Sequence, residues 1–362
     1  MSDEDEQPRV LTASVADFRY FAALLRGINF ANRASVSITP DGLTVVVEEA
    51  RVLLGTAYVF KHVFDEFEYN PEADSSSQDS DQPQYQRQAG EEGEELSTAF
   101  EIPLNTLMDC LNIFGTAGSM PGSSSKKKKK GGDGDDDDGG GGMGGGRRDK
   151  GKGRADANAD NSRLDQWFAP AKGTTGMRMS YAGRGHPLTL LVTEEAGGPT
   201  AICEITTWDP EPRLDLQFEH ERAAMRIILK SSWLREALSE LDSSSEKLTI
   251  ICNPPPPGNR AVRNAPPCLR LRAVGQFGTT ELDYPNDREV IETCECPQTI
   301  MFTYKFSHIS RAMRALQISY KTSLRIDDQG LLSMQFMMLT QKRRGEGAQT
   351  AFVQIECLPL ED

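Results

Sequence analysis

Carboxylates are the residues of this sequence best suited to chemistry on a phosphodiester. Two-metal cleavage of such a bond needs three or four carboxylates that converge within about 4 Å of two cations. Asp41 and Asp327 stand in predicted hairpin turns, where Asp is favoured for backbone reasons, and Glu48 and Glu49 are strand neighbours on opposite faces. The full set of candidates is Asp41, Glu48, Glu49, Asp283, Asp287 and Asp327. This spacing disfavours a catalytic cluster, so no catalytic residue and no metal ligand is assigned.

Sulfur and imidazole ligands are sparse as well. The seven cysteines include no CxxC pair, and there are only four histidines. Cys294 and Cys296 are too close together for an ordinary two-by-two zinc site, so we expect buried free thiols in a reducing compartment. P-loop, HExxH and nucleophile-elbow motifs are absent, and the stretch GMGGG follows no predicted strand. The sequence therefore predicts no cofactor.

Length and charge limit the classes of protein that fit. A chain of 362 residues with 38% hydrophobic content can form two domains, each with its own core. The formal net charge of -14 excludes a basic protein that wraps DNA, so any contact with nucleic acid must be confined to one face. The first residues are acidic, and nowhere do eighteen apolar residues adjoin. Secretion and membrane spanning are therefore disfavoured, and we expect a soluble intracellular protein.

Two long segments, at about 70–96 and 115–174, are too polar to join a packed core. A strand-like segment resumes after each of them, so we predict disordered inserts in loops rather than domain linkers. The lysine run 126–130 lies in the second insert. This run fits a nuclear localisation signal, a loose nucleic-acid tether or a solvated charge run, and its composition does not choose among them.

The remaining sequence repeats one pattern four times: a short strand runs into an amphipathic helix, and further strands follow. The predicted helices lie in ADFRYFAALLRGI, PLNTLMDCLNIF, SSWLREALSEL and SHISRAMRALQ. Asp41-Gly42 between two alternating runs predicts a hairpin, and Ser231 or Ser232 can cap the third helix. Strands joined by hairpins are antiparallel. The pattern therefore predicts an α+β fold of two similar domains, each with sheets backed by two helices.

The pattern pauses at residues 206–213, TTWDPEPR, where prolines and charges predict an extended connector. This places an N-terminal domain at 9–205 and a C-terminal domain at 214–360.

Several long blocks of the sequence also resemble a known family. They are FRYFAALLRGINF, DGLTVVVEEARVLLGTAYV, LNTLMDCLNIFGTAGSMPG, GMRMSYAGRGHPLTLLVTEE, LREALSELDSSSEKLTI and FGTTELDYPNDREVIETCEC. Together they resemble the middle subunit of the heterotrimeric nine-one-one checkpoint clamp, a relative of proliferating cell nuclear antigen. The resemblance covers nearly all of the chain outside residues 1–8 and the two inserts.

The resemblance implies a non-catalytic subunit in a ring of three different subunits. Antiparallel sheets would form the outside of this two-domain DNA sliding-clamp fold, and four helices would line the hole. An ATP-driven clamp loader would close the ring around double-stranded DNA in the nucleus, and the outer face would recruit checkpoint and repair proteins. Two other functions stay open. Members of the family have been described as 3′-to-5′ exonucleases, which the carboxylate spacing disfavours, and a homotrimeric polymerase processivity clamp would share the fold.

In such a ring, basic residues on the helices would meet phosphates without reading bases. The fourth helix buries Ile309, Met313 and Leu316, which leaves His308, Arg311 and Arg314 outward. The predicted DNA-facing residues are Arg19, Arg26, Lys230, Arg235, Lys305, Arg311 and Arg314. The alternative for any one of them is that it lies on an ordinary solvent-exposed helix face and does not contact DNA.

The resemblance also implies contact surfaces on the outside of the ring. The connector resembles the site where related clamps receive partner peptides, which makes Thr206, Thr207, Trp208, Asp209 and Pro210 the predicted docking residues. Subunits of a clamp join through sheet edges. The candidate edges are 192–195 with 201–205, and 270–274, and the sequence does not rank them.

Overall fold

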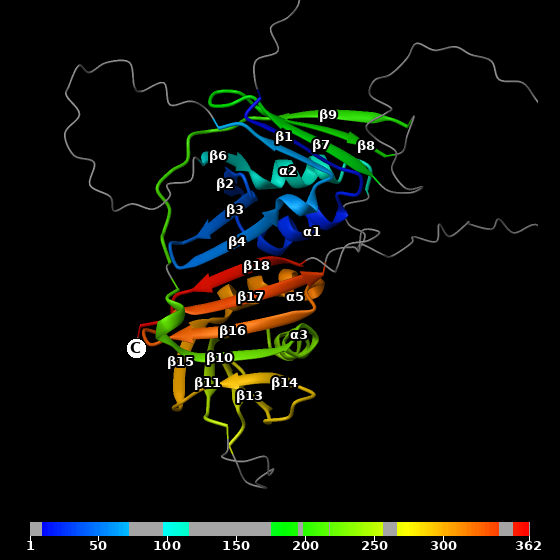
Figure 1. Cartoon of the computed structure of the whole chain (residues 1–362). Coiled ribbons are helices and arrows are strands. Elements are labelled where there is room, and N and C mark those ends of the chain that lie inside the picture. The colour runs from blue at the N-terminus through cyan, green and yellow to red at the C-terminus, as the bar shows by residue number, and fades with distance from the viewer. Residues whose placement is uncertain are drawn as a thin grey trace, which may run out of the picture.

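The computed structural model describes residues 9–71, 97–115, 175–194, 198–216, 218–255, 266–339 and 350–361. Within these ranges every strand pairing is antiparallel, and the strands form three sheets (Figure 1). The inserts predicted at about 70–96 and 115–174 lie almost wholly outside the described residues, and so does the lysine run 126–130. No helix in the described ranges is long and apolar enough to cross a membrane.

The three sheets are named here by their place in the chain. The N-terminal sheet has the order β5 (Glu66–Tyr69), β1 (Leu11–Val15), β7 (Gly176–Tyr181), β8 (Leu188–Thr193) and β9 (Thr200–Ile205). The central sheet has the order β14 (Ile291–Glu295), β10 (Ala223–Lys230), β16 (Lys321–Asp327), β17 (Leu332–Leu339), β18 (Thr350–Cys357), β4 (Leu53–Phe60), β3 (Gly42–Glu49), β2 (Arg33–Thr39) and β6 (Thr98–Pro103). The C-terminal sheet has the order β13 (Gly278–Tyr284), β12 (Leu269–Gly275), β11 (Ser245–Cys252) and β15 (Ile300–Lys305).

The helices follow the predicted pattern, with one difference. The first three are α1 (Arg19–Ile28), α2 (Leu104–Leu111) and α3 (Ser231–Glu240), and single 3-10 turns lie at Lys61–Val63 and His220–Arg222. The predicted fourth helix is divided into α4 (Phe306–Ile309), a 3-10 turn at Ser310–Ala312, and α5 (Met313–Ile318). α2, α3 and α4 each directly follow a strand, and three residues separate α1 from β1, as the repeated pattern predicts.

A joint formed by β4, β18, α1 and α5 connects the two halves of the chain. β18 pairs with β4, so that Val353 lies opposite Ala57 and Ile355 opposite Gly55. A Cβ atom at Gly55 would lie 2.6 Å from the Phe30 ring, so a larger residue here would require that ring to move. α1 packs on α5 beside this pairing. The central sheet therefore runs through both halves, whereas the sequence alone suggested separate sheets for each domain.

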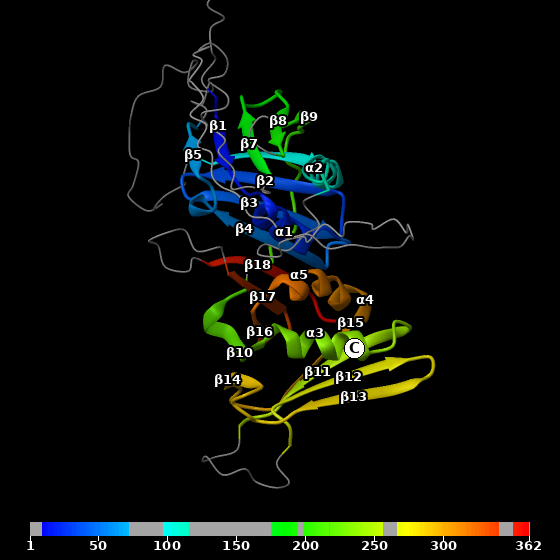
Figure 2. The same ribbon diagram turned by 90° about the vertical axis from the view of Figure 1, so that its right-hand side faces the viewer.

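The helices form one row. α2 contacts α1, α1 contacts α5, and α5 contacts α3, and Figure 2 shows these helices following one another along the molecule. In α1 the buried residues Phe21, Leu24, Leu25 and Ile28 recur at helical spacing and face the sheets. The expected α+β arrangement of antiparallel sheets with few helices is confirmed.

Candidate nucleic-acid interface and docking edge

The helix row carries the basic residues that the sequence predicted to face DNA, but their charges are not equally available. Arg19, at the start of α1, is held by Asp17: its Nε atom donates to Asp17 Oδ1 over 2.8 Å and its Nη2 atom to Oδ2 over 2.5 Å. The Arg19 side chain is only 13% exposed, and the hydrogen bond to Asp17 raises its pKa. Asp17 thus already neutralises the charge of Arg19.

Arg26 lies in the last turn of α1 and is half-buried, and burial lowers its pKa. Lys230 is exposed at the end of β10, immediately before α3, whereas Arg235 within α3 is half-buried. Lys305 is exposed at the end of β15, immediately before α4. The two lysines therefore present exposed charges at helix starts.

Two arginines of the fourth helical segment bind across the joint instead of standing free. Arg311 donates from Nη2 to Glu49 Oε1 over 2.9 Å, and Glu49 is the last residue of β3. Arg314 donates from Nη1 to the carbonyl oxygen of Asn29, just after α1. Both contacts connect the C-terminal half to the N-terminal half. The sequence could not reveal these partners, because they lie more than 250 positions away in the chain.

His308 corrects the prediction for this helix. It was expected to face outward with Arg311 and Arg314, but it is only 9% exposed. Burial is the main cause that lowers its pKa, and the nearby charge of Lys305 adds to the effect. The buried stripe of this segment is wider than predicted, because His308, Ala312 and Ala315 are buried beside Ile309 and Leu316.

The predicted docking residues extend the central sheet at its β6 edge. Trp208 forms an isolated antiparallel bridge with Glu101 of β6: the Glu101 N–H donates to the Trp208 carbonyl over 2.8 Å, and the Trp208 N–H donates back over 3.0 Å. Thr207 donates from Oγ1 to the carbonyl of His186 over 2.8 Å. Thr206 and Pro210 are exposed. Trp208 is 47% exposed, so its backbone is fixed while its ring is partly free.

Ion pairs fix the two sides of this bridge. Arg184 forms a bidentate pair with Asp209, at 2.8 and 2.6 Å, and this contact lowers the pKa of Asp209. Glu101 accepts a hydrogen bond from the N–H of Glu211 over 2.8 Å, and its carboxylate also pairs with Arg33. The segment expected to be an extended connector is therefore bound in place on the sheet edge.

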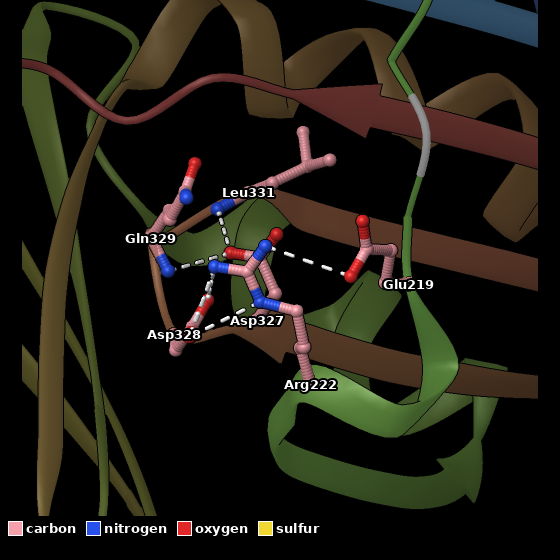
Figure 3. A network of polar contacts seen from close by, with 6 residues as sticks. All are labelled: Glu219, Arg222, Asp327, Asp328, Gln329 and Leu331. Carbon is pink, nitrogen blue, oxygen red and sulfur yellow. Dashed lines mark hydrogen bonds and ion pairs between the residues drawn. The ribbon is translucent and has the colours of Figure 1, made fainter.

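The connector continues beyond the predicted residues to a second polar network (Figure 3). Arg222 reaches Asp328 over 2.9 Å and Glu219 over 3.5 Å, while Asp327 Oδ1 accepts from the N–H groups of Gln329 and Leu331. A cleft beside this network is lined by the carboxylates of Asp215, Glu219, Asp327 and Glu361 together with Leu216 and Leu358. Sequence reasoning missed this cleft, although the low hydrophobicity of residues 209–222 was a signal that the connector is longer.

Comparison with known proteins agrees with this geometry. The family model described as "Repair protein Rad1/Rec1/Rad17" matches residues 10–338. The chain belongs to this family. It is 31% identical to the cell cycle checkpoint protein RAD1 of Homo sapiens, over 100% of this chain and 95% of the human protein. It is 27% identical to the DNA repair exonuclease REC1 of Mycosarcoma maydis, over 97% of this chain and 96% of that protein.

Among solved structures, the proliferating cell nuclear antigen of Entamoeba histolytica shares the fold of this Rad1/Rec1/Rad17 family member. The TM-score is 0.59 at 11% sequence identity, over 98% of this chain and 100% of the other. The expected two-domain sliding-clamp fold, similar to that of proliferating cell nuclear antigen, is thereby confirmed.

Of the strands predicted to lie at sheet edges in this Rad1/Rec1/Rad17 family member, only some do so. β9, which includes the predicted 201–205, is an edge strand, and its Ile202 is 70% exposed. The prediction for 270–274 is wrong, because these residues belong to β12, which lies between β11 and β13. The edges of the C-terminal sheet are β15 and β13, and β13 directly follows a turn with an exposed Phe277. The alternation of apolar residues identified β12 as a strand, but it did not show where β12 lies in the sheet.

The candidate carboxylates each have a structural role in this Rad1/Rec1/Rad17 family member. Glu48 accepts from the N–H of Leu214, Glu49 binds Arg311, and Asp283 binds Arg270 over 2.6 Å. Asp41 lies 3.8 Å from Lys61. The carboxylates of Asp287 and Asp327 accept from backbone N–H groups within their own turns. Within the described ranges, no group of three or more His, Cys, Asp or Glu residues is arranged to hold a metal ion.

Proposed function

We propose that this chain is the middle subunit of a heterotrimeric checkpoint clamp that encircles double-stranded DNA at sites of damage. The family, the RAD1 relatives and the clamp fold support this proposal. Residues 9–205 and 214–360 are the two clamp domains, and 206–213 begins the connector between them. As one third of the ring, the chain itself has no catalytic role.

The observation that carries the proposal is the clamp fold with an edge strand at each end. β9 and β13 lie at opposite ends of the molecule (Figure 1), and the helix row runs between them on one side. A strand edge has unpaired N–H and C=O groups that can bind an edge of another chain. Each partner subunit then adds its own edge to β9 or β13, and three subunits close the ring.

DNA passes through the ring along the helix row. Lys230 and Lys305 contribute accessible charge, and the arginines Arg19, Arg26, Arg235, Arg311 and Arg314 lie along the same row. Contacts to phosphates alone give affinity without sequence specificity, which suits a ring that slides. An ATP-driven loader places the ring on DNA in the nucleus, and repair and checkpoint proteins dock on Thr206–Pro210 and on the cleft beside Arg222.

The deciding experiment is mass photometry of the purified chain, alone and mixed with its two presumed partner subunits. We expect a monomer that becomes a 1:1:1 trimer. A homotrimer of the chain alone would instead support a polymerase processivity clamp. Failure to assemble with either partner, with the chain folded, would overturn the proposal.

Exonuclease activity is the second candidate, because the similar REC1 protein is named an exonuclease. A nuclease assay on the same samples, with magnesium or manganese, separates the two functions. Cleavage that is lost in a Glu49→Gln or Asp283→Asn variant would support an intrinsic nuclease. We expect no cleavage, because the carboxylates in question already bind arginines or backbone groups.

A further inference from the structure

Four of the cysteines form a cluster in the C-terminal half, although they are spread over the sequence. Cys252 ends β11, Cys268 precedes β12, Cys294 lies in β14, and Cys296 follows β14. Cys252, Cys268 and Cys296 are buried, while Cys294 is partly accessible. All are free thiols. The cluster joins the edge strand of the central sheet to the C-terminal sheet.

The backbone explains why these cysteines meet. Cys252 lies opposite Leu269 on one side and Ile300 on the other, so the neighbouring Cys268 and the turn before β15 both approach it. The N–H of Asn253 donates to the Cys268 carbonyl over 3.0 Å. Thr299 donates to the Asn253 side chain over 3.1 Å, which holds the 296–299 turn against the end of β11.

The thiols interact in pairs. Cys252 interacts with Cys294 and with Cys296, and Cys268 interacts with Cys294. Hydrogen bonding from Cys252 is the main cause that lowers the pKa of Cys294 to about 7, against the opposing effect of burial. The same contact raises the pKa of Cys252. Cys294 therefore has thiolate character near neutral pH, and a protonated thiol lies beside it.

Pairwise contact favours a disulfide over a metal site. Among the described residues no three potential ligands are arranged to hold a metal ion, although four cysteines are close. A zinc site needs ligands that surround one point at about 2.3 Å, whereas a disulfide needs only one suitable pair. Disulfides inside reducing compartments are usually transient and redox-sensing.

We propose that Cys294 and Cys252 form a reversible disulfide on exposure to hydrogen peroxide. The Cys294 thiolate attacks one peroxide oxygen, so an S–O bond forms, the O–O bond breaks, and the leaving hydroxide takes up a proton to give water. The Cys252 sulfur then attacks the sulfur of this sulfenic acid. An S–S bond forms, the S–O bond breaks, and the departing hydroxide accepts the Cys252 proton. Two thiols and one peroxide thus give one disulfide and two waters.

A second pair of touching thiols offers a control within the same molecule. Cys110 of α2 interacts with Cys203 of β9, but burial raises the pKa of Cys110 to about 12. A protonated Cys110 thiol reacts slowly with peroxide. Under peroxide, the pair Cys110 and Cys203 should therefore stay reduced while Cys294 and Cys252 join.

The test treats the full-length wild-type chain with hydrogen peroxide and maps its peptides without reduction by mass spectrometry. We expect a peptide linked between Cys252 and Cys294, reversed by dithiothreitol, with Cys110 and Cys203 still alkylatable. The initial rate should rise about tenfold from pH 6 to pH 8 and then level off. No linkage, or a linkage only between Cys110 and Cys203, would overturn the proposal.

Variants assign the roles. Cys252→Ser should stop at a sulfenic acid on Cys294 that dimedone traps, and Cys294→Ser should give neither sulfenic acid nor disulfide, while Cys110→Ser should behave as wild type. A Cys268–Cys294 linkage in the wild type would overturn the assignment of Cys252. Native mass spectrometry with added zinc gives a further check: one tightly bound zinc that protects the four thiols would replace the disulfide with a metal site. Since the peptide map uses wild-type protein, a variant that fails to fold leaves the proposal testable.

Discussion

The joint between the two halves and the edge of the N-terminal sheet each contain a strand with large apolar side chains, but β18 in the joint is paired on both sides and β9 at the edge on one side only. In the joint, β18 pairs with β4 on one side and with β17 on the other, and Ile355 is fully buried. At the N-terminal sheet, β9 pairs with β8 and has no second strand neighbour among the described residues, and its Ile202 is 70% exposed. A strand is stabilising where both sides are paired, and an unpaired side has backbone groups available to another strand.

Contacts in the joint hold the chain together, whereas the β9 edge is left open. An open edge with an exposed apolar side chain promotes aggregation unless it is covered, and proteins usually protect such edges. The joint needs no such protection, because its backbone groups and apolar side chains are already paired. We therefore expect substitutions in the joint to affect folding, and substitutions in β9 to affect assembly.

The largest expected effect comes from the same substitution made at both places. Ile355→Ala should lower the free energy of unfolding by about 2–5 kcal/mol, because it leaves a cavity in the joint. Ile202→Ala should change it by less than about 0.5 kcal/mol in the isolated chain. Urea denaturation of the two variants measures both values. Similar losses would mean that β9 is buried in the isolated chain and that the comparison is wrong.

A buried carboxyl in the joint gives a pH-dependent test. Glu356 of β18 is only 5% exposed, and burial raises its pKa to about 7 despite the hydrogen bond from Gln354 and the attraction of Arg325. The folded chain therefore holds a proton that the unfolded chain releases near pH 4.5. The resulting stabilisation is complete below pH 4.5 and is lost as the pH rises through about 7.

Glu356→Gln should remove this dependence, since an amide has no proton to lose. Relative to wild type, the variant should gain up to about 3 kcal/mol in unfolding free energy on going from pH 5 to pH 8. Thermal melts at several pH values measure the change, and Glu281→Gln on the exposed surface of β13 is the control. A wild-type curve that rises with pH over this range would show that Glu356 is ionised in the joint.

The next effect concerns assembly and rests on the proposed ring. Ile202→Glu should weaken binding of the neighbouring subunit at least tenfold, about 1.4 kcal/mol, because it places a charge on an apolar edge. The unfolding free energy of the isolated chain should not change. Mass photometry of the mixed subunits gives the affinity, with Tyr320→Glu, exposed outside any strand, as the control. Equal assembly of both variants would exclude β9 as the contact edge.

Local structure was largely predictable from the sequence. The hairpin predicted at Asp41-Gly42 separates β2 from β3, and the first three helices lie where amphipathic periodicity placed them. Local chemistry failed at the start of α3, where Ser231 or Ser232 was expected to be the cap. Lys230 occupies the cap position, and the buried Ser231 hydroxyl bonds the Thr322 hydroxyl over 2.8 Å. A tertiary contact thus replaced the local one, and a single sequence does not contain that information.

Long-range pairing was the part that the sequence could not predict. Strand patterns identified both 53–60 and 350–357, but nothing in either strand names the other as its neighbour. The same limit applies to the basic residues, whose types and spacing predicted a charged helix row. Their partners come from distant elements: Glu49 for Arg311 and Asn29 for Arg314. Only Asp17, two positions from Arg19, was close enough in the sequence to be foreseen.

The smallest effect separates residues that serve the joint from residues that serve DNA. The side chains of Arg311 and Glu49 are 40% and 26% exposed, so Arg311→Ala should cost no more than about 1 kcal/mol of unfolding free energy. Lys230→Ala should leave stability unchanged. For DNA binding we expect Lys230→Ala to have the larger effect of the two. Each phosphate contact contributes about 0.9 to the slope of log affinity against log salt concentration, so Lys230→Ala should reduce the size of this slope by about one.

Fluorescence anisotropy of the assembled clamp on duplex DNA, at several salt concentrations, measures these slopes. Arg311→Ala should change the slope less than Lys230→Ala, because Glu49 already neutralises the Arg311 charge. The matched control is Glu49→Gln, which keeps the size of the side chain and releases Arg311. If Arg311 is held by the joint, Glu49→Gln should strengthen DNA binding at low salt, and the gain should vanish in the double variant with Arg311→Ala. Equal slopes for Arg311→Ala and Lys230→Ala would instead place Arg311 on DNA, and the ion pair would then have to open when the ring closes.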